Sequence, residues 1–184
     1  MSEPEMLDLY RPGSCEPWTA NLLAALVAAK KPQILVETGT FEARTTFKLF
    51  GAMMEYASLH GSFLFTVESD FPRFDAAHRL IASWPALNNV GVQAVHGDAE
   101  AFLGSPALQK GVDFVFLDDD HDAAHVHREI ALCAKLLRPG GIIAVHDVIG
   151  HFGLGEVVQS YGGIILDFPR LHVSGGLGLI VKQA

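Results

Sequence analysis

The sequence has few cysteines and a small share of positive charge, and both shortages restrict its function. Its two cysteines, Cys15 and Cys133, form no Cys-x-x-Cys pair and no disulfide framework. Lysine and arginine total 13 against 21 acidic residues, and no basic run offsets the net charge of -8. This balance argues against nucleic acid and anionic membranes as partners.

Long hydrophobic segments are also missing. The apolar stretch at residues 22–29 is shorter than the ~20 residues that cross a bilayer. The acidic, polar residues 1–14 are unlike a signal peptide, so we expect a cytoplasmic protein. The chain has 184 residues, 49% of them hydrophobic, which predicts one globular domain over residues 1–184. About the first 15 residues are expected to be loosely held.

Strand-like and helix-like segments alternate from residue 33 to about residue 161, which predicts an α/β fold with a mostly parallel sheet covered on both faces. No helix separates the last two predicted strands, so we expect them to pair antiparallel. The predicted strands are residues 33–37, 62–68, 91–95, 112–117, 141–145, 163–167 and 176–182. The predicted helices are residues 21–30, 42–57, 73–84, 99–109, 122–137 and 155–161.

Five consecutive predicted strands each end at or just before an acidic residue. These residues are Glu37, Glu68, Asp98, Asp118 and Asp147. Ligands of open α/β sheets bind beyond the carboxyl ends of the strands, so we expect these acids to line one rim. An acidic rim repels phosphate and suits a ligand that carries hydroxyls or positive charge.

Each acid also has a structural explanation. Asp98 is a favourable N-cap for the helix that follows it, and this role is compatible with ligand binding. Glu37 could bond to loop amides, and Glu68 could be a solvated turn residue. Asp118 could belong to a solvated acidic loop, and Asp147 could only order the loop after its strand.

The chain resembles class I S-adenosylmethionine (SAM) dependent methyltransferases in five ordered segments: VETGTFEARTT, FTVESD, VHGDAEAFL, VDFVFLDDDH and LLRPGGIIAVHDV. It is most similar to small O-methyltransferases with an E-x-G-T-x-x-G-x-S-T first motif and a D-x-D-H segment after the fourth strand. The resemblance covers about residues 34–148. It implies methylation of a hydroxyl on a small molecule. It also implies a Rossmann-like, doubly wound sheet, for which we predict the order 3-2-1-4-5-7-6 with the last strand antiparallel.

The resemblance also implies which residues bind the cofactor. Glu37 and Gly39 match the loop that holds the methionine part of SAM, and Glu68 matches the acid that binds both ribose hydroxyls. Asp98 matches the acid near adenine, and Asp118 matches the acid that faces the sulfonium or a metal. The predicted cofactor-binding residues are Glu37, Gly39, Thr40, Phe41, Glu68, Ser69, Asp98, Ala99 and Asp118.

A hydroxyl nucleophile must lose its proton, so a base or a metal is expected beside the methyl group. His121 is the first candidate for the base, with Asp118 beside it, and His146 is the second. Asp118, His146 and Asp147 are the candidate ligands of a Mg²⁺ ion, although His146 stands where metal-dependent relatives carry an acid.

Ala43 is a second departure, because it stands where the family often has a glycine. Both departures leave open a non-catalytic SAM-binding protein or an interaction module. The lone Gly39 disfavours a dinucleotide enzyme, which usually needs G-x-G-x-x-G.

A metal-dependent hydrolase is a further alternative, because the segment His121-Asp122-Ala123-Ala124-His125 superficially resembles H-E-x-x-H. We otherwise expect His125 and His127 on the exposed side of their helix. A small-molecule acceptor is the expected partner, its identity is not readable from the sequence, and a homodimer is possible.

Overall fold

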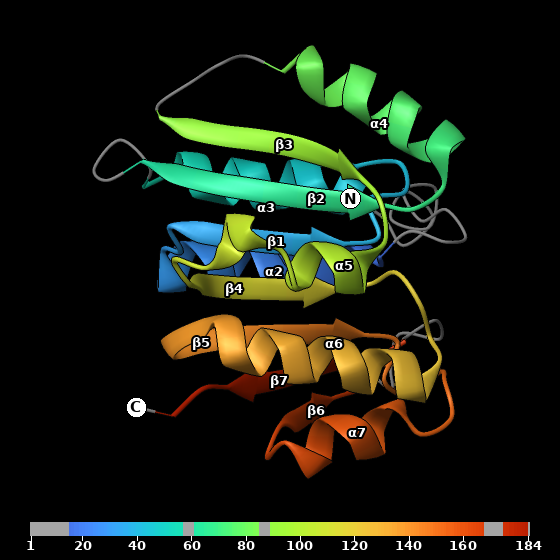
Figure 1. The fold of residues 1–184 in the computed structure, drawn as a ribbon. Helices are drawn as coiled ribbons and strands as arrows, with labels where there is room; N and C mark the ends of the chain where they lie inside the picture. Colours follow the sequence, from blue (N-terminus) through green and yellow to red (C-terminus); the bar gives the residue numbers. More distant parts are fainter. Residues whose placement is uncertain (1–14, 57–60, 85–88, 168–174, 184) are drawn as a thin grey trace, which may run out of the picture.

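The computed structural model describes residues 15–56, 61–84, 89–167 and 175–183. The described residues contain one seven-stranded sheet in the order β3-β2-β1-β4-β5-β7-β6 (Figure 1). β7 pairs antiparallel with both β5 and β6, and the other pairings are parallel. The predicted fold class and strand order are therefore confirmed. The expectation for the first 15 residues falls almost entirely outside the described residues.

The central strand is β1, which pairs with β2 on one side and with β4 on the other, so its carboxyl end lies in the middle of one sheet edge. Glu37 on β1 is level with Thr66 on β2 and with Phe116 on β4. The strands are β1 (Ile34–Thr38), β2 (Ser62–Glu68), β3 (Val90–His96), β4 (Val112–Leu117), β5 (Leu137–His146), β6 (Ile164–Leu166) and β7 (Leu177–Val181).

Helices lie on both faces of the sheet, and each face has its own core (Figure 1). The helices are α2 (Pro17–Lys30), α3 (Arg44–Met54), α4 (Phe71–Ala82), α5 (Ala99–Leu103), the 3₁₀ helix η2 (Pro106–Leu108), α6 (Ala123–Leu136) and α7 (Leu154–Ser160). One core joins α6 and α7 to the sheet through Ile130 and Leu154. The other core joins α2 and α3 to it through Leu23 and Leu49.

Several boundaries differ from the prediction by a few residues, and three of the differences have a clear physical reason. α2 begins four residues early, at Pro17, because proline fits the first turn of a helix, where no backbone donor is needed. The predicted helix over residues 99–109 is divided into α5 and η2, and η2 begins at Pro106. β5 begins at Leu137, which pairs with Val112 ahead of a register shift, so α6 ends one residue earlier than expected.

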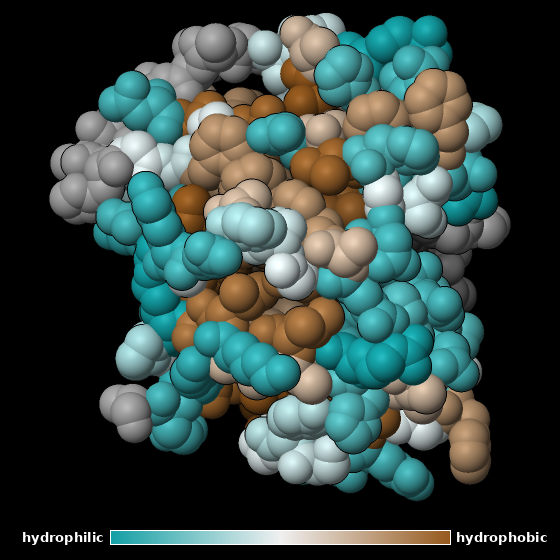
Figure 2. Space-filling view, viewed as in Figure 1, coloured by the Kyte–Doolittle hydropathy of each residue, from teal (hydrophilic) through white to brown (hydrophobic). Residues whose placement is uncertain are grey.

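The face that carries α5 and α6 is covered only in part. Figure 2 shows hydrophobic side chains at the surface over β2 and β3, where no helix lies in front of the sheet. On this side Phe65 contacts both Phe63 and Phe102, with ring centroids 4.6 and 5.5 Å apart. None of the helices in the described residues is long and apolar enough to cross a membrane.

Candidate functional site

A cavity of about 420 Å³ lies at the carboxyl ends of the central strands. It brings together nine of the residues predicted for the site: Gly39, Phe41, Glu68, Ser69, Ala99, Asp118, His121, His146 and Asp147. Glu16, Val67, Asp70, Arg73, Gly97 and Asp119 complete the wall. The wall does not include Glu37, Thr40 or Asp98, although all three lie at the same sheet edge.

The loop after β1 approaches the end of β4 so closely that only glycine fits at its tip. Gly39 has φ +81°, and its amide donates a hydrogen bond of 2.9 Å to the carbonyl of Val67 on β2. A Cβ at this position would lie 2.2 Å from the backbone oxygen of Asp118. Because backbone cannot move aside as a flexible side chain can, Gly39 fixes the spacing between the two strand ends.

We expect Gly39→Ala to lower the free energy of unfolding by more than about 2 kcal/mol, because it adds a left-handed alanine and a backbone clash. Urea denaturation measures the change. Gly51→Ala is the matched control, since nothing lies within 4 Å of a Cβ at that helical position. The control should raise stability by about 0.5–1 kcal/mol. Equal stability of the Gly39 variant and the wild type would contradict the close approach.

Ala43 occupies the left-handed conformation that glycine would adopt there, with φ 57° and ψ 24°. It is 1% exposed and packs against Ala77 and Ile81 of α4, so its methyl group is part of a small apolar cluster. A left-handed alanine costs roughly 1–2 kcal/mol. Ala43 therefore keeps the backbone conformation that a glycine would have at this position, and its methyl group is not part of the cavity wall.

Glu37 is fully buried near the end of β1 and is not part of the cavity wall. Its Oε2 accepts hydrogen bonds from the hydroxyls of Thr46 (2.5 Å) and Thr66 (2.7 Å). Its Oε1 has no hydrogen-bond partner among the described residues. Burial raises the pKa of Glu37 to about 8, against the lowering effect of the two threonines. The raised pKa favours the neutral acid near pH 7, and Oε1, which accepts no hydrogen bond, is the oxygen left to carry the proton.

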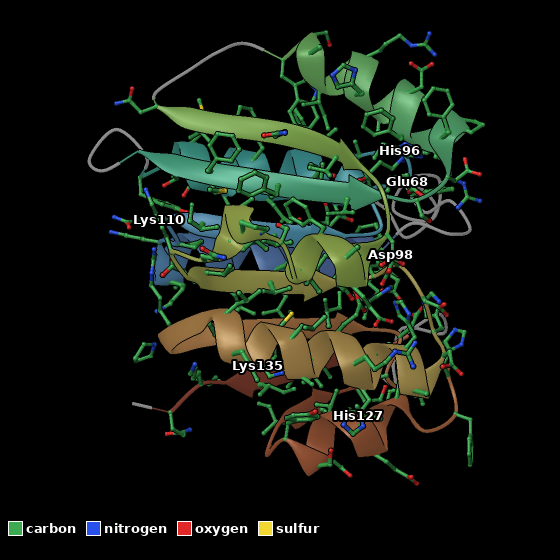
Figure 3. The ribbon with its side chains drawn as sticks, viewed as in Figure 1. Glu68, His96, Asp98, Lys110, His127 and Lys135 are labelled. Atoms are coloured by element: carbon green, nitrogen blue, oxygen red, sulfur yellow. The ribbon has the colours of Figure 1, made fainter. Side chains whose placement is uncertain are left out.

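Glu68 is 7% exposed and ties two loops to the end of β2, where it lies on the cavity wall (Figure 3). Its Oε2 accepts from the amide of Phe41 at 3.0 Å, and its Oε1 accepts from the amide of Asp70 at 2.9 Å. Each carboxylate oxygen has a second acceptor position, so both remain able to accept a hydroxyl. The ring of Phe41 is covered by Arg73, whose guanidinium carbon lies 5.0 Å from the ring centre.

Asp98 acts as a helix cap. Its carboxylate accepts a hydrogen bond of 2.8 Å from the amide of Ala101, which satisfies a free donor of the first turn of α5. The structural explanation for Asp98 therefore holds, and the neighbouring Ala99 is the residue that faces the cavity.

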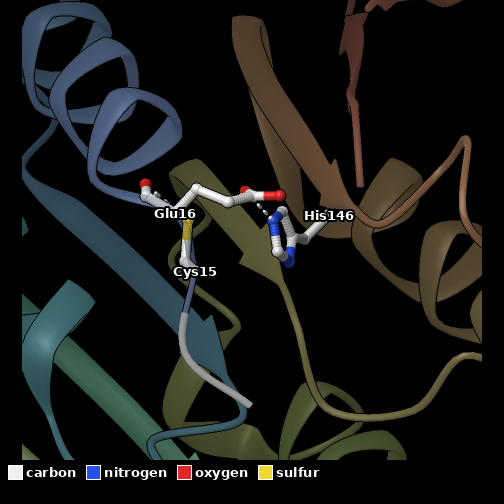
Figure 4. A group of neighbouring side chains, drawn as sticks. All are labelled: Cys15, Glu16 and His146. Carbon is white, nitrogen blue, oxygen red and sulfur yellow. Dashed lines mark hydrogen bonds and ion pairs between the residues drawn. The ribbon is translucent and has the colours of Figure 1, made fainter. Parts of the chain in front are cut away.

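His146 is held between two carboxylates at the end of β5, and Figure 4 shows one of them, that of Glu16. Its Nδ1 lies 2.8 Å from Oδ1 of Asp118, and its Nε2 lies 2.7 Å from Oε2 of Glu16. Burial would lower the pKa of His146, but Asp118 and Glu16 outweigh it and hold the pKa far above its usual value. Both ring nitrogens therefore act as donors, and the ring is an imidazolium.

The predicted magnesium ligands Asp118, His146 and Asp147 do lie together. A histidine binds a metal only through a deprotonated ring nitrogen, and both nitrogens of His146 face carboxylates. Mg²⁺ also prefers oxygen ligands. The residues present therefore do not fit a magnesium ion in which His146 is a ligand, and the magnesium site stays a prediction that this arrangement does not favour.

His121 also lies on the cavity wall and contacts Asp147, the residue that follows His146. Its Nε2 is 2.8 Å from Oδ2 of Asp147, and its ring stacks on that of His151 with centroids 4.1 Å apart. The contact with Asp147 raises the pKa of His121 above its ordinary value. Asp147 reaches this position from a left-handed backbone with φ 56°. The predicted base therefore lies beside a carboxylate, although the geometry at Nε2 is not that of a hydrogen bond.

A family model described as a methyltransferase domain matches residues 36–148 of the chain. The chain belongs to this methyltransferase family. No curated protein sequence matches it.

Solved structures share the fold of this methyltransferase at low sequence identity. The O-methyltransferase of Bacillus cereus, in complex with SAH, is 19% identical over 97% of this chain and 90% of its own, with a TM-score of 0.70. A putative O-methyltransferase of Klebsiella pneumoniae is 17% identical over 95% and 84%, with a TM-score of 0.73. The O-methyltransferase TomG of Streptomyces achromogenes, in complex with SAM, is 19% identical over 93% and 82%, with a TM-score of 0.68.

The hydrolase-like segment of this methyltransferase does not form a two-histidine site. His121 contacts Asp147, whereas His125 contacts Glu100 and Asp119. No potential metal-binding group in the described part of the chain contains both histidines. His127 is exposed as expected, but the expectation for His125 is wrong, because its side chain is only 14% exposed between α5 and α6.

Glu16 is one of the cavity residues of this methyltransferase that sequence reasoning missed. It is 2% exposed, lines the cavity and contacts His146, and its Oε1 accepts a hydrogen bond of 2.7 Å from the amide of Gly175. Burial would raise its pKa, but His146 lowers it below the usual value. The only local signal was Pro17, which marks a helix start and so places Glu16 at the N-cap.

Proposed function

We propose that this protein is a SAM-dependent methyltransferase that methylates a hydroxyl oxygen of a small molecule. The observation that carries the proposal is the cavity, where the carboxylate of Glu68, the bare backbone of Gly39 and the Asp118–His146 pair meet at one rim. Membership of a methyltransferase family and the fold shared with O-methyltransferases that bind SAM or SAH support it.

The residues present fit SAM in three respects. Gly39 lies on the cavity wall and has no side chain, so the ligand can approach its backbone. Glu68 offers two carboxylate oxygens, which suit a pair of neighbouring ribose hydroxyls. The cavity wall carries more carboxylates than basic side chains, which favours the positively charged sulfonium in a partly desolvated site.

When bound, SAM supplies a methyl group on positively charged sulfur, and the protein aligns it with the acceptor. His121 takes the proton of the acceptor hydroxyl. Its Nε2 faces Asp147, which leaves Nδ1 as the accepting nitrogen. Asp147 then stabilises the imidazolium that forms. Asp118 is kept in place by His146.

Calorimetry with SAM and chromatography of the reaction products test the proposal. We expect SAM to bind and to yield S-adenosylhomocysteine when phenols and aliphatic alcohols are offered as acceptors. SAM binding without transfer to any acceptor would favour the non-catalytic alternative. The absence of SAM binding would refute both the proposed enzyme and the non-catalytic SAM-binding protein.

A further inference from the structure

A second group of side chains lies beside the cavity, between α5 and α6. It consists of Asp119 from the loop after β4 and of His125 and Glu129, which are one turn apart on α6. Nε2 of His125 is 3.3 Å from Oδ2 of Asp119 and 3.6 Å from Oε2 of Glu129. One ligand atom from each of the three residues lies within 4.8 Å of the others.

Glu129 is the unusual member of this group. It is fully buried, and neither carboxylate oxygen has a hydrogen-bond partner among the described residues. A buried, unpaired carboxylate costs several kcal/mol. Either a proton or a bound cation must therefore compensate this charge.

His125 is oriented as a metal ligand would be. Its Nδ1 is 3.1 Å from Oε1 of Glu100, and Glu100 is itself fixed by the guanidinium of Arg128 at 2.9 and 3.1 Å. Nε2 forms a hydrogen bond with Asp119, and the tautomer that carries its proton on Nδ1 frees the lone pair of Nε2 for an ion. Metal-binding histidines are held in this way by a carboxylate on the other ring nitrogen.

We propose that Asp119, His125 and Glu129 bind a divalent transition-metal ion such as Zn²⁺. Around a tetrahedral Zn²⁺ with bonds of about 2.1 Å, neighbouring ligand atoms are ~3.4 Å apart. The distances of 3.3 and 3.6 Å from Nε2 lie on either side of this value. The two carboxylates balance the charge of the ion, and the imidazole nitrogen favours Zn²⁺ over Mg²⁺.

This site is separate from the predicted magnesium ligands and does not rest on methyl transfer. Oδ1 of Asp119 accepts a hydrogen bond of 3.1 Å from the hydroxyl of Thr38, which leaves Oδ2 for the ion. A metal there would join the loop after β4 to α6. It would also fix Asp119 on the cavity wall, beside Asp118.

The test is calorimetric titration of the chelator-treated, dialysed full chain with Zn²⁺ alone. Glu129→Gln keeps the size of the side chain and removes its charge. His127→Ala is the matched control, because His127 is an exposed imidazole on the same helix. We expect one tight Zn²⁺ equivalent in the wild type and the control, and at least tenfold weaker binding in Glu129→Gln. Zn²⁺ should raise the melting temperature of the wild type and of His127→Ala, but not that of Glu129→Gln.

Co²⁺ provides a spectroscopic check, because tetrahedral Co²⁺ absorbs strongly in the visible range, and the band should be lost in Glu129→Gln. His125→Asn is the second variant, and it should lose Zn²⁺ binding in the same way. Equal Zn²⁺ affinity in wild type, Glu129→Gln and His125→Asn would show adventitious binding and overturn the proposal. Absence of tight Zn²⁺ binding to the wild type would also overturn the proposal. It would mean that a shared proton, and not a metal ion, compensates the charge of Glu129.

Discussion

Glu68→Ala is expected to weaken SAM binding by about 100-fold or more. Two hydroxyl hydrogen bonds to a carboxylate contribute about 1.5 kcal/mol or more each, and about 3 kcal/mol corresponds to a factor of ~100. The carboxylate also holds the amides of Phe41 and Asp70, so its loss frees both loops that border the cavity. Calorimetric titration with SAM measures the change.

Two further variants separate binding from folding in this experiment. Glu156→Ala is the matched control, since Glu156 is exposed on α7 and is not part of the cavity wall. It should bind SAM as the wild type does. Glu68→Gln keeps one acceptor oxygen and should fall between the alanine variant and the wild type. A Glu68→Ala protein that melts normally and keeps full SAM affinity would exclude the ribose role of Glu68.

His121→Asn is expected to lower kcat by about 10²- to 10⁴-fold, the usual contribution of a general base. SAM affinity should change little, because the side chain acts on the acceptor hydroxyl. His127→Ala should keep full activity, since His127 lies on the exposed side of α6 and contacts the ring of Tyr161. Initial rates at saturating SAM measure the effect. A His121→Asn enzyme with normal kcat would remove His121 as the base.

The pH profile tests the same assignment. A base works when it is unprotonated, so kcat/KM should rise with pH through the pKa of His121. Asp147 raises that pKa, so the rise should occur above the ordinary histidine value near 6.5. Asp147→Asn removes this effect and should move the rise to lower pH. An unmoved profile would mean that a different group titrates.

Most of the sheet could be predicted because its strands carry local signals. The apolar runs at Ser62–Glu68 and Val112–Leu117 gave strand bounds that the structure reproduces. The predicted strand boundaries were wrong where pairing with a distant strand determines them. β5 extends back through Pro139 and Gly140 because Leu137 pairs with Val112, and no local pattern indicates this extension.

The rim of acids could be located from the sequence, because strand ends in a parallel sheet meet at one edge. Glu68, Asp118 and Asp147 do line the cavity. Glu16 could not be found in this way, since its partner His146 is 130 residues away and Glu16 precedes a helix. Glu129 was missed because a single acid in a helix usually faces solvent.

Glu16 joins segments that are far apart in the sequence, because its carboxylate contacts both His146 and Gly175. During synthesis Glu16, the residue before α2, leaves the ribosome long before either partner. Its buried charge is compensated only when β5 and the segment leading into β7 have been made. The cavity can therefore form fully only after residue 175 has been made, and a nascent or truncated chain that stops before residue 146 would leave one wall of the cavity unfinished.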